Sequence, residues 1–303
     1  MLVGFILLTY PIISMLDEYW IQRKGMAFGL LSAASGASGA VMPFIVQWLL
    51  STYGYKTAFR VLAVAMSILT APLLPVFRGR LPISNQTQIS PINFSFLSEP
   101  LFYLLGVSTM IQGFGFFFPS VYLPSYAASL GLDQTMGALL LSLMSISQVA
   151  GQFFFGFMSD KSISVLVLLI CCAVTAGIST FTLWGFAYNY TLALPLLITF
   201  SILYGFFAYG YGSMRIAMAR RVSSDPTSVT AIYAIFVFLQ GIGNISVSPI
   251  SNALLGVEDV LGVYGIARYK NMVVFTASCS VVSAVVITVW WLHPLFHKMN
   301  RAL

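Results

Sequence analysis

Long apolar stretches fill this sequence, and nearly all of its charged residues lie between them. A helix needs about 20 apolar residues to cross a hydrocarbon core about 30 Å thick. The stretches at 165–186 and 272–292 reach that length without a single Asp, Glu, Lys or Arg. Charged residues make up only 7% of the chain and mean hydropathy is +0.92, which excludes a soluble domain. The sequence therefore predicts an all-α, polytopic membrane helical bundle.

The apolar stretches divide into one partial span and about eight full spans. The partial span, 1–16, is short, contains Pro11 and lacks a basic start. A helix missing its beginning fits these residues better than a cleaved secretory signal. The full spans are expected at 25–50, 58–77, 101–126, 136–158, 164–186, 192–219, 231–255 and 272–292.

A polar segment rich in Ser, Asn, Gln and Pro divides the spans into two unequal groups. Membrane proteins built of two similar bundles have equal numbers of spans in each. We therefore expect residues 1–77 to be the remaining part of an N-terminal bundle that lacks about three helices. Residues 78–100 form the inter-bundle loop, and residues 101–303 form a C-terminal six-helix bundle.

The distribution of Lys and Arg predicts the orientation of the spans. Cytoplasmic loops carry an excess of these residues. One side of the predicted bundle holds nine of them: Arg23, Lys24, Arg78, Arg80, Lys161, Arg220, Arg221, Lys298 and Arg301. The other side holds three: Lys56, Arg268 and Lys270. The loop 78–100 and the C-terminus are thus expected in the cytoplasm, and the net charge of +6 is no sign of nucleic-acid binding.

The most specific motif enters the first full span. Residues 19–29 read YWIQRKGMAFG, and small residues and Pro43 follow. The string resembles a loop of the monocarboxylate-transporter-like branch of the major facilitator superfamily, in its fungal form. The residues that carry the resemblance are Tyr19, Arg23, Lys24, Ala27 and Gly29. The small residues alone would also suit close packing of any membrane helix pair.

A second motif, Gly156 to Lys161, resembles the short cytoplasmic loop motif of the same superfamily. The resemblance implies that Asp160 caps or pairs with neighbouring helix ends and stabilises one transport conformation. A charged turn at a helix end is the simpler alternative, since an acidic residue there also suits the helix dipole. Segments 112–126 and 240–250 are similar to fungal members of the branch.

The resemblance covers essentially the whole chain and implies an incomplete major facilitator fold. It also implies a secondary active transporter of a small organic solute, of carboxylate or secondary-metabolite type, that works by alternating access. The alternative is a truncated, non-transporting remnant that needs a partner or a missing N-terminal segment. We expect a multi-pass protein of the plasma membrane that contacts lipid and a small organic solute and binds no nucleic acid.

Polar residues in mid-span nominate a substrate pathway, because they are costly in lipid. The candidates are Gln112, Gln148, Gln152, Tyr204, Gln240 and Asn244, with Tyr122, Tyr126 and Tyr209 as further cavity-lining tyrosines. In proton-coupled relatives, an Asp and an Arg stand at the positions of Gln148 and Gln152. Their absence argues against proton coupling and against binding of an anionic monocarboxylate. Interhelical amide contacts and interfacial tyrosines are the structural alternatives.

The remaining candidate residues give weaker indications of a functional site. Arg215 would meet an anionic substrate, but we expect it to snorkel or to pair with Asp160 or Asp225. His293 and His297 are two ligands without a third, so no metal site is expected. The chain contains no Walker A or dinucleotide-binding motif, and we expect neither a cofactor nor an enzyme. Asn189 starts a candidate N-glycosylation sequon on the predicted outer side.

Overall fold

The computed structural model describes residues 24–72, 93–161, 163–188, 190–256 and 264–292, together with Ile12, Tyr19 and Trp20. Several sequence predictions lie outside the described residues: the partial span 1–16 apart from Ile12, residues 78–92 of the loop, Arg23, Asn189, His293, His297 and the C-terminus. Lys24 and Gly29 are described only in their backbone.

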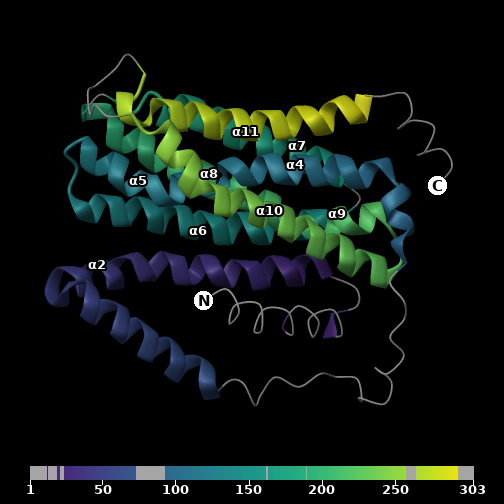
Figure 1. Cartoon of the computed structure of the whole chain (residues 1–303), viewed down its shortest axis with the longest axis horizontal. Helices are drawn as coiled ribbons and strands as arrows, with labels where there is room; N and C mark the ends of the chain where they lie inside the picture. The colour runs from purple at the N-terminus through teal and green to yellow at the C-terminus, as the bar shows by residue number, and fades with distance from the viewer. Residues whose placement is uncertain are drawn as a thin grey trace.

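The described elements are all helices, and most of them run nearly parallel in one bundle (Figure 1). They are α2 (Lys24–Thr70), the short 3-10 helix η2 (Phe94–Ser98), α4 (Pro100–Phe116), α5 (Phe118–Ser129), α6 (Gln134–Ser159), α7 (Val165–Ser179), the π-helix η3 (Thr180–Trp184), α8 (Tyr190–Ser213), α9 (Arg215–Val222), α10 (Pro226–Leu254) and α11 (Ala267–Leu292).

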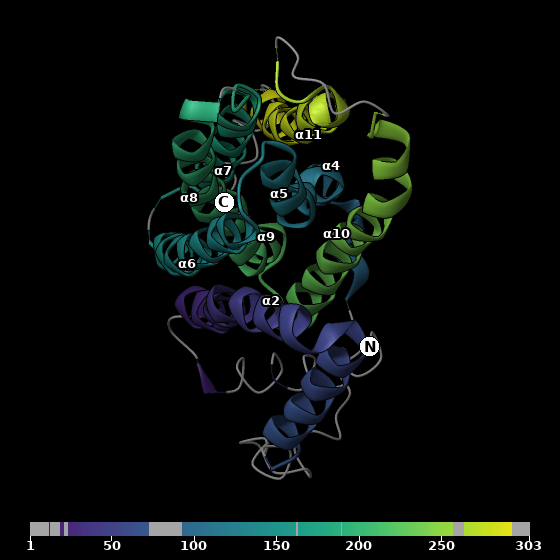
Figure 2. The ribbon, with the colours of Figure 1, turned by 90° about the vertical axis from the view of Figure 1, so that its left-hand side faces the viewer.

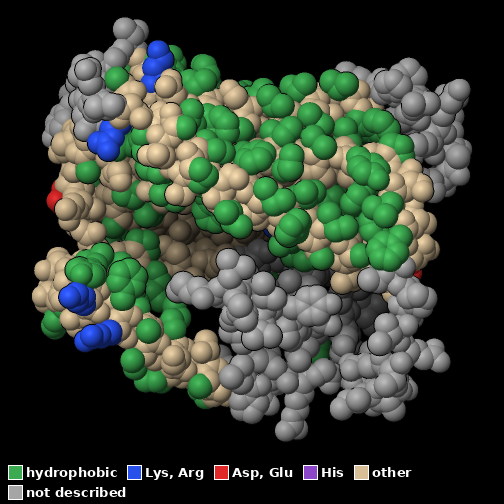
Figure 3. All heavy atoms as spheres, viewed as in Figure 1, with side chains coloured by type: hydrophobic (Ala, Val, Ile, Leu, Met, Phe, Trp, Pro, Cys, Tyr) green, Lys and Arg blue, Asp and Glu red, His purple; other side chains and the backbone are tan. Residues whose placement is uncertain are grey.

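Six segments in the described part of the chain are long and apolar enough to cross a membrane. They are Pro100–Ser129, Gln134–Ser159, Val165–Trp184, Leu192–Val222, Pro226–Leu254 and Ala267–Trp290. Each overlaps one of the six later spans expected from the sequence, so an integral, multi-pass helical protein is confirmed. The predicted count of eight full spans is not confirmed. Hydrophobic side chains cover much of the bundle face in Figure 3, and the Lys and Arg side chains visible on that face lie at its left-hand end, where α6 begins.

Helix α2 covers both predicted spans before the loop, and it breaks at Gly54. Gly54 has φ 70° and ψ 171°, a conformation open essentially to glycine alone. The first arm lies along α6, whereas the second arm turns away from the bundle (Figures 1 and 2). Large apolar side chains on the second arm, such as Phe59 and Ile68, are exposed.

Two spans of the bundle are bent, and each bend has a local cause. α4 ends and α5 begins around Phe117, where Pro119 lacks the N–H that would continue the ladder. The Tyr204 hydroxyl donates to the Phe116 carbonyl across 3.1 Å at this bend. α8 and α9 are separated at Met214, directly after a Gly-Ser pair of the kind found at helix kinks.

Glycine allows α6 and α8 to approach each other closely. A Cβ at Gly151 would collide with the backbone carbonyl of Phe206, and one at Gly205 would collide with that of Met144. Membrane helices pack by van der Waals contact rather than by a hydrophobic driving force, so small residues at the interface set the approach distance. This contact holds the walls of the site described below.

Asp225 caps the N-terminus of α10. Its carboxylate accepts hydrogen bonds from the Ser228 N–H (3.0 Å) and from the hydroxyls of Thr227 (2.5 Å) and Ser228 (2.8 Å). These bonds, the Thr227 hydroxyl first, hold the pKa of Asp225 below its ordinary value of 3.8. The ionised cap therefore stabilises the fold, and Pro226 at the first turn completes the start of the helix.

Replacing Asp225 with alanine is expected to lower the melting temperature at pH 7. The folded-state pKa is depressed, so the cap's contribution is present above the unfolded pKa of about 3.8 and is lost as pH falls through the folded pKa. The difference between wild type and Asp225→Ala should shrink as the pH is lowered below about 3.8. Thermal unfolding in detergent measures this, with Asp225→Asn as the control that keeps a capping oxygen. An equal gap at pH 3 and pH 7 would contradict it.

Candidate functional site

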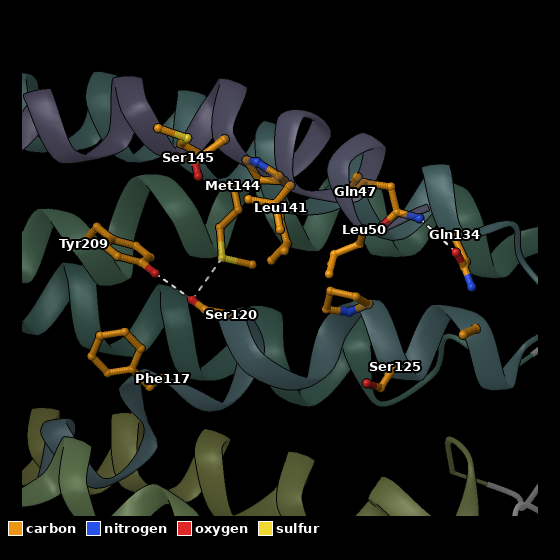
Figure 4. A pocket seen from close by; sticks show the side chains of 17 residues that line it. Gln47, Leu50, Phe117, Ser120, Ser125, Gln134, Leu141, Met144, Ser145 and Tyr209 are labelled. Atoms are coloured by element: carbon orange, nitrogen blue, oxygen red, sulfur yellow. Dashed lines mark hydrogen bonds between the residues drawn. The ribbon is translucent and has the colours of Figure 1, made fainter. Parts of the chain in front are cut away.

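A cavity of about 650 Å³ lies between the first arm of α2 and the later helices α5, α6 and α8 (Figure 4). Its lining residues are Gly39, Met42, Pro43, Val46, Gln47, Leu50, Phe117, Ser120, Pro124, Ser125, Ala128, Gln134, Ala138, Leu141, Met144, Ser145 and Tyr209. The volume falls within the range of small-molecule sites. The walls come from segments on both sides of the loop 78–100.

Two polar pairs interrupt the apolar lining of the cavity. At one end the Gln47 amide nitrogen donates to the Gln134 amide oxygen at 2.8 Å. At the other end the hydroxyls of Ser120 and Tyr209 are 2.7 Å apart, and Ser120 also lies 3.8 Å from the Met144 sulfur (Figure 4). Among the described residues that line this cavity, none carries a charged side chain. The arrangement suits an organic molecule with an apolar body and few polar groups.

From the edge of the cavity onward, α2 packs tightly on the middle of α6. The Gln148 amide donates to the Ser35 hydroxyl at 3.1 Å, and the Ser142 hydroxyl donates to the Ala40 carbonyl at 2.7 Å. A Cβ at Gly36 would lie 2.8 Å from the Ser145 carbonyl oxygen. The cavity is therefore closed toward the end where α6 meets α7, called the α6–α7 end below.

Asp160 joins α6 to the start of α2 at this closed end. Its carboxylate accepts a hydrogen bond from the Met26 N–H at 2.9 Å. A negative charge there satisfies a free donor of the helix N-terminus and suits its dipole. Nearby, the Ser159 hydroxyl donates to the Gly156 carbonyl at 2.7 Å, and the Lys161 amino group lies 4.5 Å from the Phe157 ring centre. The conformational role of this motif stays a prediction.

The residues of the predicted pathway lie elsewhere in the described structure. Neither Tyr204 nor any of the five predicted pathway amides lines the cavity. Gln148 bonds Ser35, and Tyr204 is fully buried at the α4–α5 bend. Three amide oxygens are buried without a hydrogen-bond partner within the described residues: those of Gln112, Gln152 and Asn244. Their part in a pathway stays a prediction.

The four tyrosines named from the sequence take different positions. Tyr209 lines the cavity. Tyr126 instead donates to the Ala187 carbonyl at 2.9 Å in the bundle core. Gln47, Gln134 and Ser120 were missed, because Gln47 and Gln134 stand near span ends and a serine hydroxyl is common in spans. The available signal was a glutamine near the end of one predicted span, Gln47, and another just before the start of a later one, Gln134.

The prediction that Arg215 pairs with Asp160 or Asp225 is wrong. Its guanidinium donates from Nη2 to the Gln240 amide oxygen on α10. The predicted carboxylates cap helix starts instead: Asp160 bonds Met26 and Asp225 bonds Ser228. The reason is the break at Met214, which starts a new helix at Arg215 and directs its side chain back toward α10.

Comparisons with known proteins identify the family of this bundle. The profile of the Major Facilitator Superfamily matches residues 105–301, which is more than half of the chain. This chain belongs to the Major Facilitator Superfamily. The resemblance seen in the motifs at 19–29 and 156–161 is thereby confirmed at the level of the family.

Relatives place the chain among the monocarboxylate-transporter-like members of the superfamily. It is similar to MFS transporter asaE of Aspergillus flavus, with 24% identity over 84% of this chain and 56% of the relative. Monocarboxylate transporter 12 of Xenopus laevis is 24% identical over 86% of this chain and 61% of the relative. The fujikurins efflux protein of Gibberella fujikuroi is 24% identical over 84% and 53%, respectively. The chain thus spans little more than half the length of these relatives.

Of the five residues predicted to carry the family motif of this Major Facilitator Superfamily member, the structure describes the surroundings of Tyr19 and Ala27. Ala27 is buried at the start of α2, whereas Tyr19 is exposed. Within the described residues, no three His, Cys, Asp or Glu side chains gather in a group that could hold a metal ion. The side chains that line the described cavity offer apolar contacts and hydrogen bonds.

Proposed function

We propose that this protein is a secondary active transporter of a small organic solute that works by alternating access. The observation that carries the proposal is the cavity between α2 and the later bundle, which is closed at the α6–α7 end by the packing of α2 on α6. A site between two bundles, closed on one side, is what alternating access requires. Energy would come from a solute or ion gradient.

The cavity lining supports a solute with an apolar body and one or two hydrogen-bonding groups. The Ser120–Tyr209 and Gln47–Gln134 pairs are its described hydrogen-bonded pairs, and Ser125 and Ser145 add two hydroxyl groups. Relatives named as a fujikurins efflux protein and as a monocarboxylate transporter support a secondary metabolite or a small carboxylate as the solute class. The same relatives support a transporter rather than an enzyme.

The bundle boundaries and the orientation complete the proposal. The protein lies in the plasma membrane, and its two moving parts are residues 1–77 and residues 101–303. The cytoplasmic loop 78–100 joins them. Lys161, Arg220 and Arg221 stand at the α6–α7 end, which supports placing that end in the cytoplasm. The cavity would then face the outer side.

A cavity-filling substitution tests the proposal. Ser125→Trp puts a large side chain at an exposed lining position of α5, and we expect it to abolish most solute movement without unfolding the bundle. Val121→Trp is the matched control, since Val121 is 51% exposed on the same helix and does not line the cavity. The measurement is uptake and efflux in cells and in liposomes with labelled acids, neutral polyols and apolar metabolites.

The same assay separates the two candidate functions. Transport by wild type and Val121→Trp with loss in Ser125→Trp supports the proposal. A wild-type chain that moves no solute under any gradient would contradict it and leave the non-transporting remnant. Equal transport by Ser125→Trp would place the solute route outside this cavity.

A further inference from the structure

Arg215 is a charged residue inside a membrane span with incomplete hydrogen bonding. It belongs to the segment Leu192–Val222, and its Nε is buried without a partner in the described structure. Its Nη2 bonds the neutral amide of Gln240, which is 5% exposed. A cation at such a depth is costly, and intramembrane arginines are normally paired or face a substrate route.

The break before Arg215 adds free backbone donors at the same place. The Met214 N–H bonds the Tyr211 carbonyl at 3.3 Å, and the Met218 N–H bonds the Met214 carbonyl at 2.9 Å. Residues 215–217 are the first residues of α9, so no carbonyl of α9 accepts from their N–H groups, and the side chain of Met214 does not cap them. Ile216 is 3% exposed and Ala217 is 8% exposed, so water does not readily satisfy these donors.

The guanidinium lies on the same side as these donors. Side chains in a helix tilt toward its N-terminus. A Cβ built on Gly212 would lie 3.0 Å from Arg215 Nη2, which places the guanidinium back over the end of α8. Gly212 thus leaves room that any other residue would fill. Gln240 approaches from α10, which Figures 1 and 2 show beside α9.

We propose that the break between α8 and α9 binds the carboxylate of an organic anion. The guanidinium offers a planar fork of donors, the N–H groups of residues 215–217 offer the positive end of a helix, and the Gln240 amide nitrogen offers one more donor. A single buried cation matches a singly charged carboxylate, whereas a doubly charged phosphate would leave uncompensated negative charge. Arg215 thereby supplies a cation that α6, with Gln148 and Gln152, does not.

The position of this site agrees with a route through the bundle. Tyr209 lines the cavity, and Arg215 follows it by six residues, which is about 9 Å of helical rise toward the α6–α7 end. A carboxylate at the break would therefore lie between the cavity and the predicted cytoplasmic side. The inference rests on the proposed transport function, because a binding site within a span serves a solute that crosses it.

Binding of benzoate compared with its neutral isostere benzamide tests the inference. Benzoate should bind the detergent-purified chain about tenfold or more tighter than benzamide, because it adds charge-assisted hydrogen bonds. Arg215→Gln should remove that preference, and Arg215→Lys should keep only part of it. Arg220→Gln is the matched control, since Arg220 is exposed on the same helix, and it should leave the preference unchanged. Ligand-induced shifts in melting temperature and equilibrium binding of labelled probe give the readout.

Three outcomes of the binding experiment overturn the inference. A wild-type chain without preference for benzoate, or a preference that persists in Arg215→Gln, excludes the site. Displacement of benzoate by phosphatidylglycerol vesicles, with none by phosphatidylcholine vesicles, would assign the break to a lipid headgroup. Arg215→Gln removes an incompletely bonded buried charge, so its melting temperature in the absence of probe should not fall. Binding needs no gradient, so the two proposals can fail separately. A chain that prefers benzoate over benzamide but moves no solute contradicts the transport function alone. A chain that moves solute but does not prefer benzoate contradicts this inference alone.

Discussion

Replacing Gly151 with alanine is expected to disrupt the packing of α6 on α8 and to destabilise the whole bundle. The new Cβ would collide with the Phe206 carbonyl, which is backbone and cannot rotate away. Overpacking typically costs about 1–3 kcal/mol, and a collision with backbone belongs at the upper end or beyond. Thermal unfolding in detergent and the monodisperse fraction in gel filtration measure the effect. Gly205→Ala should behave alike, because its Cβ would meet the Met144 carbonyl.

Gly241→Ala provides the control of opposite sign. Gly241 lies inside α10, and a Cβ built there would meet no atom within 4 Å. Alanine is favoured over glycine in a helix interior by about 0.5–1 kcal/mol, so this variant should melt at the same or a higher temperature. Similar melting temperatures for Gly151→Ala and Gly241→Ala would show that the α6–α8 contact is looser than described.

Replacing Gly36 with leucine is expected to open the closed end of the cavity. The side chain would push against the Ser145 carbonyl and Val149, both on the face of α6 that α2 covers. An overpacking cost of about 1–3 kcal/mol in the closed state alone corresponds to roughly a 5–150-fold shift toward states in which α2 is separated from α6. Solute movement should fall accordingly, because closure at this end is lost.

Labelling of a cysteine reporter measures that opening. The reporter is Gln148→Cys, at a position that is 9% exposed against α2, in a chain whose Cys171, Cys172 and Cys279 are replaced. A membrane-impermeant maleimide should react slowly with this cysteine in the chain that keeps Gly36. It should react at least about tenfold faster in the Gly36→Leu chain. Ala34→Leu is the control, because Ala34 is exposed on α2. Equal labelling rates in the Gly36→Leu and Ala34→Leu chains would contradict the closed interface.

Much of the fold could be predicted from the sequence because lipid imposes a length and a composition on each span. The uninterrupted apolar residues of 165–186 predicted a helix that the structure has as Val165–Trp184. Motifs of local residues predicted the family as well, since the strings at 19–29 and 156–161 need no long-range contact to be read.

The site was much harder to predict, because its contacts join residues far apart in the chain. The hydrogen bond between Asp160 and the Met26 N–H spans 134 positions, and the bond between Gln47 and Gln134 spans 87. The candidate amides were selected for their cost in lipid, but that cost does not say which face of a helix a residue occupies. Arg215 shows the same limit, since its partner Gln240 depends on a helix break that no residue spacing reveals.

The sequence by itself determined that this chain is a bundle of membrane-spanning helices and to which superfamily it belongs. Only the tertiary structure decided where the cavity lies, which end is closed and what surrounds Arg215. The physical reason is that lipid and the interior of a helix bundle are both apolar. Hydrophobic periodicity, which orients a helix at the surface of a soluble protein, therefore carries little information about which neighbour each face of a membrane helix meets.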